Sequence, residues 1–244
     1  MSNIKLTIAY DGSGYCGWQV QKGRLTIQGV LEESLSRIEK KPVTLYGAGR
    51  TDAKVHAWGQ TANFHTDVTL PPLVWQKAIN RLLPKDIVIK EAVPVPDDFH
   101  ARHSALHKHY RYRILLSKFH CPFERNYAWH IPYRLDLDAM KRAADYLLGE
   151  HNFSSFQGTG SDIETTVRNM EGLTLELREN ILQIDLTADG FLRHMVRNIV
   201  GTLVEVGRGK LFPDAITEIL AARDRSKAGQ TAPPQGLCLI SVGY

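Results

Sequence analysis

Two hydrophobic periodicities alternate along this chain, and this alternation restricts its fold more than any other feature. Ile4, Leu6, Ile8 and Tyr10 alternate with more polar neighbours, as in a half-buried strand. Apolar residues then recur every three or four positions over 27–39, which predicts an amphipathic helix. The same half contains expected strands at 44–48, 60–65 and 87–93, and an expected helix that opens at Pro71 and Pro72.

The second half shows the same alternation. A strand is expected over 108–117, with Tyr110, Tyr112, Ile114 and Leu116 on one face. The remaining expectations are a helix over 137–148 that stops at Gly149, strands at 165–178 and 181–188, a helix over 191–206, a short helix at 213–222 and a strand at 237–242. The predicted class is α+β with α/β-type alternation and a large sheet, in two halves, 1–104 and 105–244, joined near a turn-rich connector at 94–98.

Composition and charge exclude several classes of protein. No apolar run is long enough to span a bilayer and no signal-peptide pattern opens the chain, so we expect a cytoplasmic protein with no membrane partner. Cys16, Cys121 and Cys238 lie far apart, which argues against a disulfide framework and against a cysteine-rich zinc site. The net charge of +4 allows a polyanionic partner without requiring one.

A glycine-rich turn after the first strand resembles a dinucleotide fingerprint. Gly12, Gly14 and Gly17 have the G-x-G-x-x-G spacing. In that fold, however, the turn must open directly into a helix whose N-terminus faces the pyrophosphate, and here several residues separate Gly17 from the predicted helix. A dinucleotide site is therefore not expected.

A second candidate is the loop expected over 49–58, which holds Arg50, Asp52, Lys54 and His56 between two strands. An ionised carboxylate near an arginine can act as a nucleophile or a base. A solvated Arg–Asp pair on a surface turn is the commoner explanation for such residues, and the pattern alone favours it.

Two further segments combine basic and aromatic residues. The run over 100–113 contains histidines, arginines, Tyr110 and Tyr112, a composition that suits either RNA binding or ordinary strand core. His103 and His107 are four apart, but no Glu accompanies them as in a zinc-binding helix. In the helix predicted over 191–206, Arg193 and Arg197 should share one face, which points either to solvent or to a phosphate-lined or carboxylate-bearing cleft.

Several ordered motifs together resemble the TruA family of tRNA pseudouridine synthases. These motifs are YDGSGYCGWQ, AGRTDAKVHA, FHARHSA, KHYRYRI, GFLRHMVRNIVG and GLCLISVGY, and they extend over nearly the whole chain. The resemblance implies the pseudouridine synthase fold, with two ferredoxin-like or RRM-like halves that form one large mixed, mainly antiparallel sheet flanked by helices. It implies isomerisation of uridine to pseudouridine at positions 38 to 40 of the tRNA anticodon stem-loop, by a homodimer that needs no cofactor and no metal.

The resemblance also implies roles for individual residues. Asp52 matches the catalytic aspartate, and Arg50 matches the arginine of the same motif. Tyr110 matches the tyrosine that packs on the target base, and Arg197 matches the arginine that pairs with the catalytic carboxylate. Leu237 matches an apolar residue of the pocket wall.

One departure from the family motif lies beside Asp52. The family has glycine where this chain has Lys54, so a positive φ at this position would strain the lysine. Lys54 could instead add a phosphate contact. Two alternative functions remain: a non-catalytic RNA-binding protein with RRM-like halves, and a zinc hydrolase that uses the histidines of 100–109.

Overall fold

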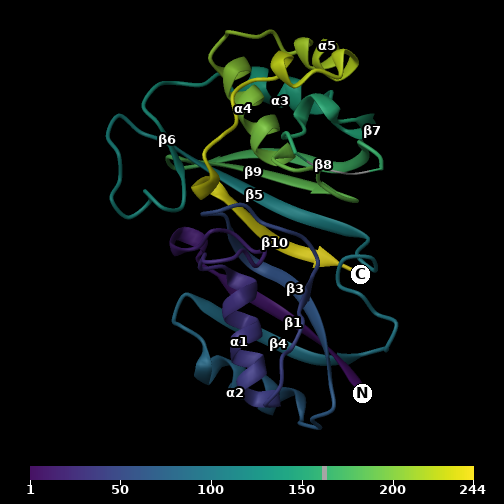
Figure 1. The fold of residues 1–244 in the computed structure, drawn as a ribbon. Helices are drawn as coiled ribbons and strands as arrows, with labels where there is room; N and C mark the ends of the chain where they lie inside the picture. Colours follow the sequence, from purple (N-terminus) through teal and green to yellow (C-terminus); the bar gives the residue numbers. More distant parts are fainter. Residues whose placement is uncertain (161–163) are drawn as a thin grey trace. The chain divides into compact units, whose positions relative to one another are not determined.

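The computed structural model describes residues 1–160 and 164–244 (Figure 1). The chain consists of two compact units, which are described separately. Unit 1 comprises Met1–Leu106 and Cys238–Tyr244, and unit 2 comprises His107–Leu237.

Unit 1 combines strands with two helices. Its strands are β1 (Ser2–Tyr10), β2 (Tyr46–Gly47), β3 (His56–Thr66), β4 (Ile87–Val95) and β10 (Leu237–Gly243), and its helices are α1 (Ile27–Glu39) and α2 (Pro72–Leu82). β1 runs antiparallel to both β3 and β4, β2 is antiparallel to β3, and β10 is parallel to β3. Leu6, Ile8, Leu31 and Leu35 have no exposed surface, so the alternating strand face and the helical stripe both form core, as their periodicity predicts.

Unit 2 has the same kind of construction. Its strands are β5 (His107–Leu116), β6 (Trp129–Ile131), β7 (Gly149–Asn152), β8 (Val167–Arg178) and β9 (Ile181–Ala188), and its helices are α3 (Leu137–Asp145), α4 (Met195–Gly207) and α5 (Ala215–Ala222). β5, β9, β8 and β7 are neighbours in that order and antiparallel, while β6 lies parallel to β5. The predicted α+β class, with mostly antiparallel strands flanked by helices, is confirmed.

The start of α4 corrects one sequence prediction. The helix begins at Met195 rather than at Phe191, because His194 adopts a left-handed conformation with φ of 59°. Arg193 therefore lies before the helix and does not share a helical face with Arg197. Its Nη1 donates instead to the carbonyl oxygens of Thr159, at 2.7 Å, and Gly160, at 3.1 Å.

Other boundaries also differ from prediction, and three of them are notable. β3 begins at His56, so the loop that carries Asp52 ends sooner than expected. β4 continues through Pro94, which an outermost strand tolerates because it needs no ladder hydrogen bond from that nitrogen. α3 ends at Asp145, before the predicted stop at Gly149.

None of the helices in the described part of the chain has both the length and the apolarity needed to cross a bilayer.

Candidate active site

Asp52 lies in the loop between β2 and β3, in unit 1. Its own side chain is half-buried, Thr51 beside it is buried, and Arg50 is exposed. The Thr51 hydroxyl lies 2.8 Å from the Tyr10 hydroxyl of β1, and the amide of Val55 donates to the carbonyl of Asp52 at 3.1 Å. The first contact anchors the loop to β1, and the second closes its turn.

The glycine-rich segment 11–18 packs against this loop and forms hydrogen bonds with its backbone. The Trp18 amide donates to the Thr51 carbonyl at 3.0 Å, and the Lys54 amide donates to the Tyr15 carbonyl at 3.3 Å. The Gly12 amide donates to Nδ1 of His56 at 3.1 Å. Hydrogen bonds therefore join the loop and segment 11–18 on both sides of Asp52, and they restrict the conformations open to its backbone.

Two of the glycines are required by the closeness of this contact. A Cβ on Gly12 would lie 2.0 Å from the Val55 carbonyl oxygen. A Cβ on Gly17 would lie 2.6 Å from the Thr51 oxygen, and Gly17 also has a φ of 89°. The G-x-G-x-x-G spacing thus permits backbone packing against the Asp52 loop. α1 begins only at Ile27, so the helix that a dinucleotide turn requires does not follow.

Segment 11–18 is itself anchored to the rest of unit 1. The Tyr15 hydroxyl donates to Oδ1 of Asp86 at 2.8 Å, and the Asp11 amide donates to the Asp86 carbonyl at 2.9 Å. Burial, followed by the hydrogen bond to Asp86, raises the pKa of Tyr15 well above its usual range, so the phenol stays protonated and keeps donating. The sequence analysis did not identify segment 11–18 as a support for the Asp52 loop, although the spacing of Gly12, Gly14 and Gly17 could have indicated it.

Lys54 has a φ of 66° and an exposed side chain. The sequence analysis predicted strain if Lys54 had a positive φ, and it does. The lysine occupies a left-handed conformation that favours glycine.

Tyr110, Arg197 and Leu237 belong to unit 2. Tyr110 on β5 is buried, and its ring meets Phe191 edge to face with centroids 5.2 Å apart. Arg197 lies in the first turn of α4, where its Nε donates to the Ala232 carbonyl at 2.8 Å. Leu237 is also buried, at the start of β10.

Tyr112 is a supporting residue that the sequence did not reveal as one. Its hydroxyl donates to the Pro233 carbonyl at 2.7 Å, and a Cβ on Gly236 would lie 2.6 Å from its ring. Burial raises the pKa of this phenol well above its usual range, while the nearby charge of Arg197 acts in the opposite direction. Tyr112 therefore holds the chain just before Leu237.

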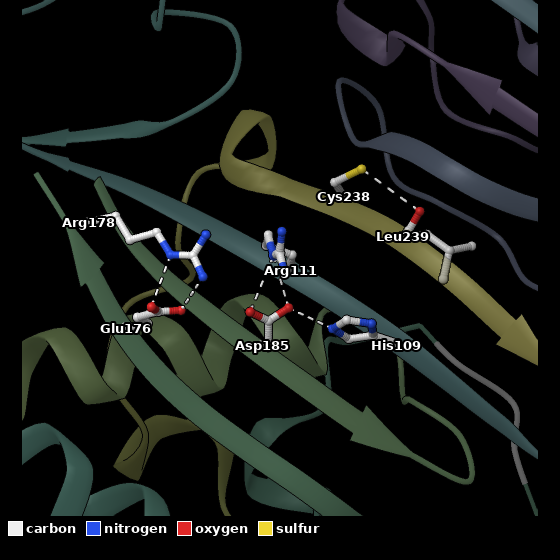
Figure 2. Close-up of polar contacts among 7 residues, drawn as sticks. All are labelled: His109, Arg111, Glu176, Arg178, Asp185, Cys238 and Leu239. Carbon is white, nitrogen blue, oxygen red and sulfur yellow. Dashed lines mark hydrogen bonds and ion pairs between the residues drawn. The ribbon is translucent and has the colours of Figure 1, made fainter. Parts of the chain in front are cut away.

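His109 and Arg111 alternate along β5 with Tyr110 and Tyr112, so they lie on the other face of the strand. In Figure 2, His109 and Arg111 of β5 reach Asp185 of the neighbouring β9, while Arg178 meets Glu176 on β8. Nε2 of His109 lies 2.6 Å from Oδ1 of Asp185, and Nε of Arg111 donates to the same oxygen at 2.9 Å. Asp185 offsets the charge of this pair, so these contacts favour a structural role for His109 and Arg111 over phosphate binding.

Within residues 1–160 and 164–244, no group of three or more His, Cys, Asp or Glu side chains is placed to hold a metal ion.

The residues predicted for the site are thus divided between the units. Arg50 and Asp52 share one loop of unit 1, and Tyr110, Arg197 and Leu237 belong to unit 2. Backbone hydrogen bonds hold the loop that carries Asp52, and hydrogen bonds with Ala232 hold Arg197.

Comparison with known proteins identifies the family. Residues 6–104 and 143–244 match the family described as tRNA pseudouridine synthase. Proteins named tRNA pseudouridine synthase A are 48% identical in Thermoanaerobacter sp. (strain X514) and 47% identical in Acetivibrio thermocellus, with 100% of both chains covered in each case. The homologue of that name in Geobacter sp. (strain M21) is 45% identical, over 100% of this chain and 99% of its own.

A much more distant structural likeness was also found. A chain in the crystal structure of a Cbf5-Nop10-Gar1 complex matches 96% of this chain and 57% of its own, at 9% identity and a TM-score of 0.39, and nothing about function follows from it. The family match and the full-length relatives are decisive, and the chain belongs to the tRNA pseudouridine synthase family, a family of isomerases.

Proposed function

We propose that this chain converts uridine to pseudouridine at positions 38 to 40 of the tRNA anticodon stem-loop, with Asp52 as the catalytic carboxylate. The observation that carries the proposal is the fixed Asp52 loop. Thr51 and Lys54, on either side of Asp52, are hydrogen-bonded through their backbones to segment 11–18. A reacting carboxylate held in this way loses little conformational freedom when the substrate binds.

The reaction needs only rearrangement of the substrate. The N1–C1′ bond breaks, the uracil turns, and C5 bonds to C1′, while the proton on C5 is lost and N1 gains one. No electrons enter or leave, so the chemistry requires no redox cofactor. A carboxylate at C1′ can attack that carbon or remove the 2′ proton on the way to a glycal, and both routes require Asp52 to be ionised.

The other residues have distinct roles in this proposal. The target base must leave its stack before Asp52 can reach it, and Tyr110 packs on the extruded uracil. The family resemblance gives Arg197 the role of keeping Asp52 ionised, since a guanidinium that pairs with a carboxyl favours its charged form. Leu237 forms part of the apolar pocket wall, and the exposed Arg50 binds the RNA backbone.

Replacement of Asp52 by Asn tests the assignment. Asp52→Asn should bind tRNA with affinity close to that of the wild type but lose at least about 10³-fold in single-turnover rate, since the amide is neither a base nor an effective nucleophile. Asp98→Asn, at an exposed position of the same unit, is the matched control and should keep the full rate. Turnover of Asp52→Asn near that of Asp98→Asn would refute the role of Asp52.

A non-catalytic RNA-binding protein is the less favoured alternative. RRM-type recognition stacks bases on exposed aromatic rings of the sheet. In β5, Tyr112 has no exposed surface and only Tyr110, at 7%, reaches the surface, so this strand does not present the several open rings on which an RRM stacks two or three bases.

The modified positions and the assembly need separate measurements. Pseudouridine mapping on tRNA from cells that lack the gene should show loss at positions 38 to 40 alone. We also infer a cytoplasmic homodimer, on the strength of the family resemblance and of a tRNA substrate. Cell fractionation and sedimentation of the purified protein test these two points.

A further inference from the structure

A short segment of unit 2, residues 228–233, lies directly against α4, and we call it the strap. It is part of the connection between α5 and β10 (Figure 1). The Gly229 amide donates to the Thr202 hydroxyl at 2.9 Å. A Cβ on Gly201 of α4 would lie 1.7 Å from the Gln230 carbonyl oxygen, so the two backbones are in close contact. The strap therefore cannot move without disturbing α4.

The strap holds Arg197 through a reciprocal pair of hydrogen bonds. The Ala232 amide donates to the Arg197 carbonyl at 3.0 Å, and Nε of Arg197 donates back to the Ala232 carbonyl at 2.8 Å. Because Nε lies in the guanidinium plane, the second bond helps to set the direction in which this group points. The orientation of Arg197 thus depends on the position of Ala232.

A second arginine, Arg225, ties the strap to the helix. Its Nη2 donates to Oδ1 of Asn198 and to the Thr231 hydroxyl, both at 3.0 Å, and its Nη1 donates to the Ala228 carbonyl at 3.2 Å. The Thr231 hydroxyl also donates to Oδ1 of Asn198, at 2.6 Å. Asn198 is fully buried, follows Arg197 directly in α4, and donates to the Phe156 carbonyl at 2.7 Å.

The acceptors of Arg225 are an amide oxygen, a hydroxyl and a backbone carbonyl, all of them uncharged. Partial burial lowers the pKa of Arg225, which reflects the cost of removing a guanidinium from water. An apolar side chain could fill the same space without that cost. A planar group with three donated hydrogen bonds is suited instead to fixing the position of the strap relative to α4.

We propose that Arg225 is a positioning residue for catalysis: by tying Ala228 and Thr231 to Asn198, it holds the Ala232 carbonyl where it orients the Arg197 guanidinium. This inference rests on the proposed role of Arg197 in keeping Asp52 ionised. Arg225 acts through the strap and does not itself contact the reacting atoms.

The test compares chemistry with binding in single-turnover experiments with saturating enzyme. Arg225→Met should lower the rate constant about 10²-fold, because small misplacements of a catalytic group have effects of that size. Its Kd for tRNA should change less than about threefold, a difference below about 0.7 kcal/mol. Arg225→Lys keeps the charge but loses the planar fork, so it should also be slow. Arg223→Met, at an exposed position two residues earlier, is the matched control and should match the wild type.

A double-mutant cycle with Arg197 separates positioning from general stabilisation. If Arg225 acts through Arg197, the variant with both Arg197→Gln and Arg225→Met should be no slower than Arg197→Gln alone. If the rate of the double variant is lowered by the product of the two single effects, the inference is wrong. It is also wrong if Arg225→Met loses tRNA affinity at an unchanged rate. If Arg225→Met fails to fold, Thr231→Val, which removes strap contacts without burying a charge, takes its place in the cycle.

The outcomes also distinguish this inference from the proposed function. A wild-type rate for Arg197→Gln would mean that the assigned role of Arg197 is wrong, whatever Arg225 does. A slow Arg197→Gln together with a fast Arg225→Met would reject the positioning role alone.

Discussion

Lys54 has a φ of 66°, two residues from the proposed catalytic carboxylate. Cβ contacts with the backbone make this conformation unfavourable for residues other than glycine, at a cost of about 1 kcal/mol. Its amide nonetheless donates to the Tyr15 carbonyl, at 3.3 Å, so the loop retains its contact with segment 11–18. The hydrogen bond to Tyr15 therefore holds Lys54 in a backbone conformation that a lysine disfavours.

Two substitutions at this position separate backbone strain from charge. Lys54→Gly and Lys54→Ala both remove the ammonium group, but only glycine relieves the strain, so Lys54→Gly should have the larger free energy of unfolding by about 1 kcal/mol. Urea denaturation measures this difference. If Lys54 contacts a phosphate, both variants should reduce the slope of log affinity for tRNA against log salt by about one unit. Unchanged slopes in both variants would rule the contact out.

At the scale of elements, segment 11–18 and the Asp52 loop behave as one packed pair. Gly17 packs against the backbone of Thr51, Asp52 and Ala53, for which its missing Cβ leaves room. Gly14, three residues earlier, would have nothing within 4 Å of an added Cβ. Gly14 is therefore a matched control for a substitution at Gly17.

Gly17→Ala should lower both the free energy of unfolding and the single-turnover rate. Gly14→Ala should leave both unchanged. The added methyl group of Gly17→Ala meets the Thr51 oxygen at 2.6 Å in a left-handed conformation, which should lower the free energy of unfolding by about 2 kcal/mol. Displacement of the loop should lower the single-turnover rate by about 10²-fold. Equal rates for the two variants would show that the contact does not position Asp52.

At the scale of the whole molecule, the expected homodimer needs an apolar surface to bury. The loop between β5 and β6 in unit 2 exposes Phe119 by 72% and Phe123 by 86%. Large exposed aromatic rings are common in surfaces that bind another protein. Arg113, bonded to Glu124 at 2.9 Å and to the Tyr127 carbonyl at 3.3 Å, anchors this loop to β5.

We expect a second copy of the chain to cover this loop. Changing Phe119 and Phe123 together to Ser should weaken the dimer by at least about 30-fold, as expected for loss of an interface hot spot. Sedimentation across a range of concentrations measures the effect. Phe212→Ser, which removes a ring that is 81% exposed elsewhere in unit 2, is the control. A dimer equally stable in both variants would place the interface on another surface.

The sequence by itself determined the features that depend on neighbouring residues. The helix predicted over 27–39 is confirmed as α1, and the alternation of Tyr110, Tyr112 and Ile114 predicted the buried face of β5. Such periodicities follow from the geometry of a single element, so they can be identified without knowledge of its neighbours. The ordered motifs likewise indicated the family, because they depend only on residue identity and order.

Only the tertiary structure decided the features that depend on distant contacts. The left-handed His194 starts α4 late, and nothing in the periodicity of GFLRHMVRN indicates it. The pairing of Gly17 with the Asp52 loop joins residues more than thirty positions apart, and Arg225 meets Asn198 across 27 positions. Local patterns carry no information about which segments will meet, because packing of the whole unit selects those contacts. The residues that hold Asp52 and Arg197 in place therefore became visible only in the fold.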